Sequence, residues 1–177
     1  MSELFSIQLQ NRQQQGRDGV WLDLPTTTEQ VQAALRQIGI SSDNPQGLFI
    51  SGYFAEEEKR FAIPYNMVLA SNVDALNFLA AQLETLSAGE RAELNAALQA
   101  PQSELSSIGK ITDFPENVDY YVHLPDVHGP AQLGDYYLNR SGMVDMPDEW
   151  KGGIDTAQFG RYVAQQEQGA FTQYGYL

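Results

Sequence analysis

Cysteine is absent from this sequence of 177 residues, and histidine occurs only at positions 123 and 128. Without cysteine there is no disulfide frame, no thiolate nucleophile and no sulfur-ligated metal. His123 and His128 flank Asp126, but their spacing matches no strong zinc pattern, and surface or turn histidines are the simpler interpretation. No apolar run approaches the ~20 residues that span a bilayer, and the residues after Met1 do not form a targeting segment. We expect a soluble cytoplasmic protein without metal, cofactor or membrane partner.

The motifs of common enzyme classes are missing as well. The sequence contains no Gly-x-Ser-x-Gly elbow, no Walker loop and no Gly-x-Gly-x-x-Gly turn. A catalytic triad would need one of the two histidines as its base. Carboxylates are adjacent at 56–58 and 148–149, but adjacency does not place two carboxyl groups across one substrate. Each group is followed within two residues by a lysine, which is typical of a solvated face. The sequence therefore predicts a protein that is not an enzyme.

Positive charge is scarce, and negative charge is abundant and dispersed. The 23 Asp and Glu residues against 10 Lys and Arg give a net charge of −13. The acids number 8 in residues 1–64, 5 in 65–112 and 10 in 113–177. A folded surface of this kind attracts basic partners and repels nucleic acid, although ordinary solubility would also account for it. Only Lys59 and Arg60 are adjacent basic residues, so the footprint of a nucleic-acid-binding protein is absent. We expect no direct binding to nucleic acid.

Residues 1–64 predict a small ββαβ domain. The pattern of apolar residues and turn signals gives its elements in order: a strand at 5–9, a polar loop at 11–18, a strand at 20–22 closed by Pro25, a helix from Thr26 to Gly39, and a strand at 48–54.

Two further blocks follow, and together the three predict an α+β chain. Residues 65–112 predict a short helical bundle, with helices near 73–86 and 89–100 and a short turn ending at Gly109. Residues 113–177 predict a small α+β domain. Its expected elements are a strand at 118–124, a helix starting at Pro130 and ending before Gly142, a helix capped by Asp155 and closed by Gly169, and a strand at 171–176.

Three stretches of the sequence together resemble the ArdA antirestriction family. Near the N-terminus the resemblance rests on Trp21-Leu22-Asp23-Leu24-Pro25 and on Ile38-Gly39-Ile40. In the last third it rests on Tyr120-Tyr121, Pro125-Asp126-Val127-His128, Leu133-Gly134-Asp135-Tyr136-Tyr137-Leu138 and Ser141-Gly142. The closing segment adds Phe159-Gly160-Arg161-Tyr162, Gly169-Ala170-Phe171-Thr172 and Gly175-Tyr176-Leu177. The resemblance covers roughly the first 60 and the last 65 residues.

The resemblance implies an elongated three-domain protein (1–64, 65–112 and 113–177) that dimerises through its C-terminal domain and mimics bent DNA. Such proteins occupy the DNA groove of type I restriction–modification enzymes in the bacterial host cell and so protect incoming mobile DNA. The carboxylates expected to take the place of phosphates are Glu56, Glu57, Glu58, Asp74, Glu84, Glu90, Glu93, Asp113, Glu116, Asp119, Asp126, Asp145, Asp148 and Glu149.

A homodimer interface is predicted where apolar and aromatic residues concentrate in the third block. Interfaces favour aromatic residues and methionine at their centre. The residues are Leu133, Tyr136, Tyr137, Leu138, Met143 and Val144. The alternative is that they form the internal core of that domain.

Two other functions stay open on the sequence. The protein could inhibit another nucleic-acid-binding defence system, such as a CRISPR effector, whose basic channel is the same electrostatic target. It could also be a structural or regulatory binding module whose acidity is incidental. Salt-sensitive competition with DNA for a restriction enzyme would distinguish the antirestriction function from both of these alternatives.

Overall fold

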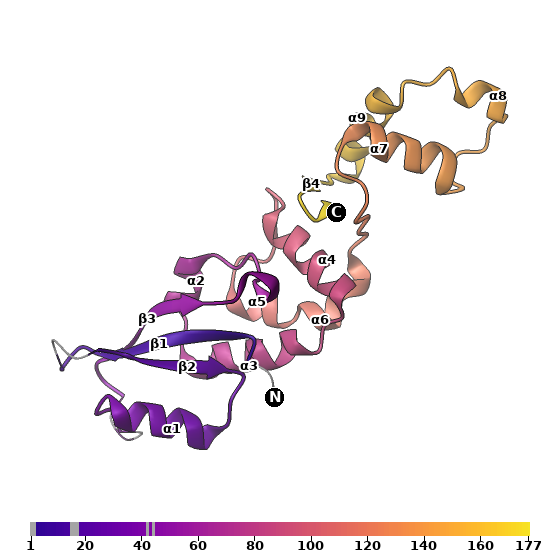
Figure 1. Cartoon of the computed structure of the whole chain (residues 1–177). Coiled ribbons are helices and arrows are strands. Elements are labelled where there is room, and N and C mark those ends of the chain that lie inside the picture. Colours follow the sequence, from indigo (N-terminus) through magenta and orange to yellow (C-terminus); the bar gives the residue numbers. More distant parts are fainter. Residues whose placement is uncertain (1–2, 15–17, 42, 44) are drawn as a thin grey trace. The chain divides into compact units, whose positions relative to one another are not determined.

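The computed structural model of the chain describes residues 3–14, 18–41, 43 and 45–177 (Figure 1). Its residues group into two compact units. Unit 1 comprises Met1–Ser87 and Glu104–Glu116, and unit 2 comprises Ala88–Ser103 and Asn117–Leu177. Unit 1 has a three-stranded sheet with helices and unit 2 has helices with a two-stranded sheet, so the predicted α+β class is confirmed. The division into three domains stays a prediction.

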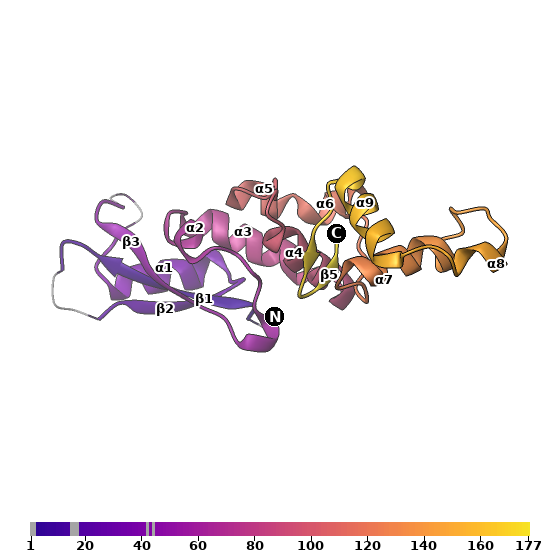
Figure 2. The same ribbon diagram turned by 90° about the horizontal axis from the view of Figure 1, so that it is seen from above.

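The predicted ββαβ order is present in unit 1. Its elements are β1 (Phe5–Asn11), β2 (Val20–Leu24), α1 (Thr28–Gln37) and β3 (Leu48–Phe54). The three strands form an antiparallel sheet in the order β2-β1-β3, with α1 beside it (Figures 1 and 2). Thr27, one residue after the expected Thr26, caps α1, and Gly39 follows the helix with a φ of +74°. Residues 15–17 of the predicted polar loop lie outside the described residues.

The alternation of apolar and polar residues in β1 gives the sheet one buried and one open face. Phe5, Ile7 and Leu9 are buried, and their partners on β2 and β3 extend the same layer. Asn11 continues this layer at the end of β1, where its Nδ2 donates to the backbone oxygen of Ile38 at 2.9 Å. This bond satisfies a buried amide and ties the end of α1 to the sheet.

Helices complete unit 1. They are η1 (Glu57–Lys59), α2 (Tyr65–Leu69), α3 (Val73–Glu84), α5 (Ile108–Thr112) and most of α6 (Phe114–Asn117). Leu76, Leu79 and Leu83 lie on one face of α3 and are fully buried, and we call them the leucine stripe. Asn72 caps α3 through its Oδ1, which accepts from the backbone nitrogen of Ala75 at 2.9 Å.

Unit 2 is built mainly from helices. Its elements are α4 (Ala88–Gln99), η2 (Val118–Tyr120), α7 (Pro130–Asp135), the π-helical segment η3 (Tyr136–Arg140), α8 (Asp148–Lys151), α9 (Thr156–Glu167), β4 (Phe171–Thr172) and β5 (Gly175–Tyr176). Pro130 at the first position of α7 and Asp155 as the cap of α9 are confirmed. Val127, Leu133 and Tyr176 form a small buried core.

Helices α7 and α9 pack against each other (Figure 1), and each contributes a glycine to the contact. A Cβ on Gly134 would lie 1.8 Å from the backbone oxygen of Thr156, and one on Gly160 would lie 1.7 Å from that of Pro130. Both distances are far below van der Waals contact, so the helix backbones approach each other more closely than any side chain would allow.

Three sequence predictions in the later part of the chain are wrong. Residues 118–124 do not form a strand, because η2 occupies the first three and only Leu124 bridges to another segment, at Tyr176. The β-branched and aromatic residues there lack a neighbouring strand, and strand propensity depends on such a partner. The predicted strand at 171–176 is a hairpin, in which Gly175 takes a φ of +111°. The short turn expected to end at Gly109 is instead a helix, α5, that begins at Ile108.

Candidate functional site

A cluster of carboxylates lies at the end of the sheet in unit 1, and we call Glu3, Asp23 and Glu56 the acidic cluster. The Ser6 hydroxyl donates to Asp23 Oδ1 at 2.5 Å. A hydrogen bond with Asp23, together with the negative charge of that residue, raises the pKa of Glu3. Lys59 Nζ lies 3.5 Å from Glu56 Oε2 and 3.4 Å from the backbone oxygen of Glu3. One lysine therefore lies near two of the three carboxylates, Glu3 and Glu56, and the local charge stays negative.

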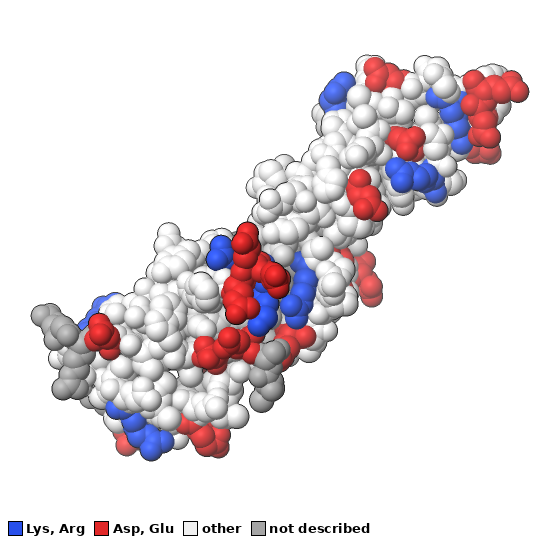
Figure 3. Space-filling model, in the orientation of Figure 1, with Lys and Arg blue, Asp and Glu red and all other residues white. Residues whose placement is uncertain are grey.

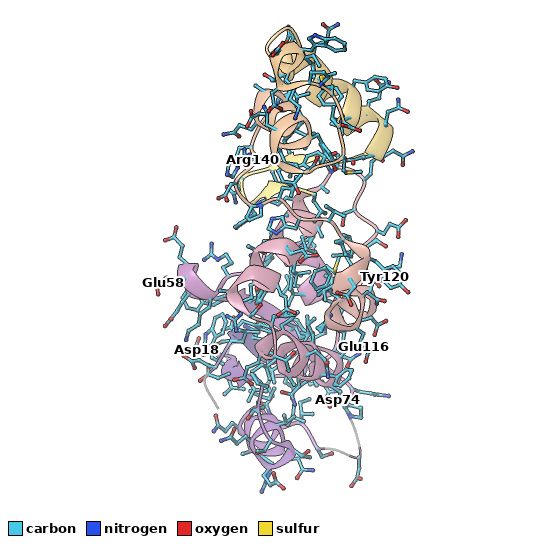
Figure 4. The ribbon with its side chains drawn as sticks, turned by 90° about the vertical axis from the view of Figure 1, so that its right-hand side faces the viewer. Asp18, Glu58, Asp74, Glu116, Tyr120 and Arg140 are labelled. Atoms are coloured by element: carbon cyan, nitrogen blue, oxygen red, sulfur yellow. The ribbon has the colours of Figure 1, made fainter. Side chains whose placement is uncertain are left out.

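The rest of the predicted carboxylates in unit 1 lie at separate places. Glu57 and Glu58 belong to η1 and are exposed, as are Asp74 at the start of α3 and Glu116 in α6. Figure 4 shows Glu58 on one side of this unit and Asp74 and Glu116 on the other. Asp113 is exposed and Glu84 is half-buried. The carboxylates of unit 1 therefore do not form one continuous row.

In unit 2 the structure brings three of the predicted acids together. Burial, followed by the charges of Glu90 and Asp119, raises the pKa of Glu93. Glu93 Oε1 is buried and has no hydrogen-bond partner among the described residues. Glu90 is half-buried, whereas Asp119 is exposed. This group carries negative charge, but its central carboxylate is only partly available to a partner.

The last four predicted carboxylates of unit 2, Asp126, Asp145, Asp148 and Glu149, are exposed. Asp148, which is exposed, pairs with the largely buried Lys151 at 3.3 Å across one turn of α8. The view in Figure 3 shows Asp and Glu in several separate groups, with Lys and Arg among them and wide uncharged areas between. Of the fourteen predicted carboxylates, Glu84, Glu90 and Glu93 are half-buried and the other eleven are exposed.

The residues predicted for a dimer interface divide between core and surface. Leu133 and Leu138 are buried within unit 2, and Tyr136 and Tyr137 pack against its core. Met143 stands out, because 74% of its surface is exposed. Within this set, Met143 is the residue with the largest free apolar surface.

A carboxylate that the sequence reading did not single out organises this part of unit 2. Tyr137 Oη donates to Glu167 Oε1 at 2.5 Å, and Tyr176 Oη donates to Glu167 Oε2 at 2.9 Å. Burial, then the hydrogen bond to Glu167 and its charge, raises the pKa of both tyrosines. Glu167 thereby links η3, α9 and β5.

The two histidines have local structural contacts. His123 Nε2 lies 2.7 Å from the backbone oxygen of Tyr174, and His128 Nδ1 lies 3.3 Å from that of Thr172. Both therefore contact the C-terminal hairpin. Among the described residues, no group of three or more His, Asp or Glu side chains is placed to hold a metal ion.

Sequence reasoning missed Glu3 and Asp23 as part of a charged site. The alternation in β2 does indicate that Asp23 is exposed, but its neighbours depend on strand register. Pairing of Ser6 with Asp23 and with Phe54 aligns the ends of β2 and β3 on either side of β1, and η1 follows β3 directly in the chain. Long-range pairing of this kind cannot be read from local spacing.

A folded, strongly acidic surface of this kind is typical of proteins that act by binding a basic partner. The comparison with families agrees, because residues 15–177 match the model described as "Antirestriction protein (ArdA)". The chain therefore belongs to the ArdA antirestriction family. A search among curated proteins gives no match. None of the helices among the described residues combines the length and the apolar composition of a membrane span.

Proposed function

We propose that this antirestriction protein inhibits type I restriction–modification enzymes by occupying their DNA-binding groove as an acidic mimic of DNA. The observation that carries the proposal is the combination of family membership with exposed carboxylates in both units. The Lys and Arg side chains that normally hold DNA phosphates would contact these carboxylates instead. The protein would act in the bacterial cytoplasm by binding alone, without a catalytic step and without binding DNA itself, and so protect incoming mobile DNA.

Competition with DNA tests this function directly. Purified protein should displace labelled DNA from the methyltransferase core of a type I enzyme, and its apparent affinity should fall as salt rises, because salt screens every charge contact. Exposed ion pairs contribute only ~0–1 kcal/mol each, so one carboxylate-to-amide change should weaken competition by less than about fivefold. The triple variants E56Q/E57Q/E58Q and D145N/D148N/E149Q should each weaken it about tenfold, and their combination further.

Two results would contradict the mimic. Direct binding of the purified protein to DNA would be one. The other would be a single carboxylate substitution that abolishes inhibition while the fold is unchanged, because that points to one discrete hot spot. Circular dichroism of each variant provides the control for folding.

We also propose that the protein is a homodimer whose interface includes the exposed part of the segment from Tyr136 to Val144. Because Tyr137 bonds to Glu167 and packs on the core, its substitution would disturb folding as well as association. Met143→Arg tests the interface more cleanly, since this side chain is largely exposed. Sedimentation equilibrium should show a folded monomer for this variant, and an unchanged dimer would exclude Met143 from the interface.

A further inference from the structure

The open face of the sheet in unit 1 carries exposed aromatic side chains on an otherwise mostly uncharged surface. Strand pairing places Trp21 beside Gln8 and Phe54 beside Ser6 on this face. Trp21 is 49% exposed and Phe54 is 56% exposed. We call this surface, defined by Ser6, Gln8, Trp21, Gly52 and Phe54, the aromatic face. Covering these large aromatic side chains with a partner would remove apolar surface from water, which is favourable.

Trp21 is held in place by the sheet. A Cβ added at Gly52 would lie 3.0 Å from Trp21 Cη2 and 3.2 Å from Gln8 Cβ, so the indole lies over the glycine across strand β1. An aromatic ring over a strand glycine stabilises the sheet, and this accounts for the contact of the indole with Gly52. It does not account for the exposure of Trp21, which remains 49% exposed. A side chain fixed in this way loses little conformational entropy when a partner covers it.

The aromatic face is continuous with the acidic cluster. Ser6 pairs with Phe54 on one side and with Asp23 on the other, and its hydroxyl bonds to the Asp23 carboxylate. Directly opposite residues in a sheet lie about 5 Å apart. Phe54 is also the last residue of β3, two positions before Glu56. An exposed apolar area therefore lies beside several negative charges.

The negative charge beside the aromatic face determines which kind of partner can bind there. A nucleic acid or an anionic membrane would be repelled, and a second copy of this face would bring like charges together. A protein surface rich in arginine and lysine fits both parts of the site, since its cations can pair with the carboxylates. A guanidinium can also stack on the exposed side of an indole or phenyl ring. Binding energy at protein interfaces concentrates in such aromatic residues.

We propose that the aromatic face, together with the acidic cluster, docks on the Arg- and Lys-rich DNA-binding surface of the target enzyme. This inference rests on the proposed function and adds to it a contribution that salt does not screen. The carboxylates set the salt dependence of binding, and Trp21 and Phe54 supply affinity through burial and stacking.

Two aromatic variants and a matched control test the proposal in the same competition assay with a type I methyltransferase core. Phe54→Ala and Trp21→Ala should each weaken competition about tenfold or more, with the slope of affinity against salt unchanged. Phe78→Ala is the control, because Phe78 lies on α3 of the same unit and is 59% exposed. Its effect should stay below twofold. The triple variant E3Q/D23N/E56Q, which neutralises the acidic cluster, should weaken competition and also flatten the salt dependence.

The possible results separate this inference from the function on which it rests. If the charge variant loses competition while both aromatic variants keep it, the docking role of the face is wrong and the mimic stands. Equal losses for Phe54→Ala and Phe78→Ala would also overturn the docking role, since the effect would not belong to this face. If the wild-type protein fails to displace DNA, the proposed function itself is wrong, and the inference with it. Should Trp21→Ala prove unfolded by circular dichroism, Phe54→Ala decides alone.

Discussion

Unit 1 and unit 2 contain similar kinds of elements but hold them together in different ways. In unit 1, alternating strand residues and a leucine stripe bury many large apolar side chains, including Ile7, Leu9 and Leu79. In unit 2 the core that contains Tyr176 is small, and α7 and α9 meet backbone to backbone at Gly134 and Gly160. The stability of unit 1 therefore depends on the volume of its buried side chains. The stability of unit 2 depends on the absence of side chains at two positions and on hydrogen bonds to Glu167.

The largest effect is expected from adding one methyl group at the helix crossing of unit 2. In Gly160→Ala the new Cβ would meet the backbone oxygen of Pro130, and neither backbone can yield without separating the helices. We expect a loss of at least about 3 kcal/mol in the free energy of unfolding of unit 2. Hydrogen exchange followed by mass spectrometry should show faster exchange in α7 and α9 and little change in β1. Gly152→Ala is the control, because nothing lies within 4 Å of a Cβ there, and equal effects of both changes would contradict the close-packing account.

Removing volume should have the corresponding effect in unit 1. Leu79 is fully buried in α3, so Leu79→Ala should cost about 3 kcal/mol through lost burial and a cavity. Chemical denaturation measures the change, and hydrogen exchange should place it in the sheet and α3. The neighbouring exposed Phe78→Ala should cost less than about 0.5 kcal/mol. If the two changes cost the same, the leucine stripe is not what stabilises this unit.

A smaller effect is expected from the tyrosine–carboxylate bonds of unit 2. Because the folded-state pKa of Tyr137 and of Tyr176 is raised above the unfolded value of about 10, the stability linked to these phenols is complete below pH 10. It is lost as the pH rises further, when the unfolded chain gives up its protons first. Glu167→Gln removes one acceptor and should cost about 1 kcal/mol at pH 8. It should also make the alkaline fall in stability less steep in urea denaturation from pH 8 to 11.

Tyr53 in unit 1 provides the contrast for that experiment. Burial raises its pKa to about 12, but its hydroxyl has no hydrogen-bond partner among the described residues. Tyr53→Phe should therefore leave stability at pH 8 unchanged or slightly higher, while Tyr176→Phe lowers it. Equal losses in the two variants would mean that the bonds to Glu167 contribute nothing of their own.

The smallest effect concerns Glu93 in α4. Its folded-state pKa is raised by burial and by neighbouring acids. The carboxylate is therefore less stable in the folded protein than in the unfolded chain, and its charge lowers the free energy of unfolding at pH 7. Glu93→Gln should raise stability at pH 7 by roughly 0.5 kcal/mol at most, since water still reaches much of the side chain. The gain should vanish as the pH falls to about 4, where Glu93 of the folded wild type is protonated. Thermal unfolding at both pH values measures it, with the exposed Glu149→Gln as control, and a gain that persists at pH 4 would exclude the charge as its cause.

Much of the fold could be predicted where the signal is local. The first strand, the cap Asp155 and the proline at the start of α7 all lie where their patterns indicated, because each depends on residues within one turn or one strand. Prediction was wrong at 118–124 and 171–176, where a strand needs a partner that local spacing cannot identify. The candidate site could likewise be predicted only in its local features. The exposure of most acids was predictable, but the pairing of Glu3 with Asp23 and the partial burial of Glu93 were not.

The sequence by itself determined the net charge of −13, the lack of cysteine and the helix and strand propensities, because these are sums over single residues or short neighbourhoods. It also carried enough of a family pattern to indicate antirestriction proteins. Only the tertiary structure decided which carboxylates meet, why Gly134 and Gly160 must be glycines, and that Trp21 lies over Gly52 while it remains 49% exposed. Those facts depend on strand register and on helix crossings, which bring together residues far apart in the chain.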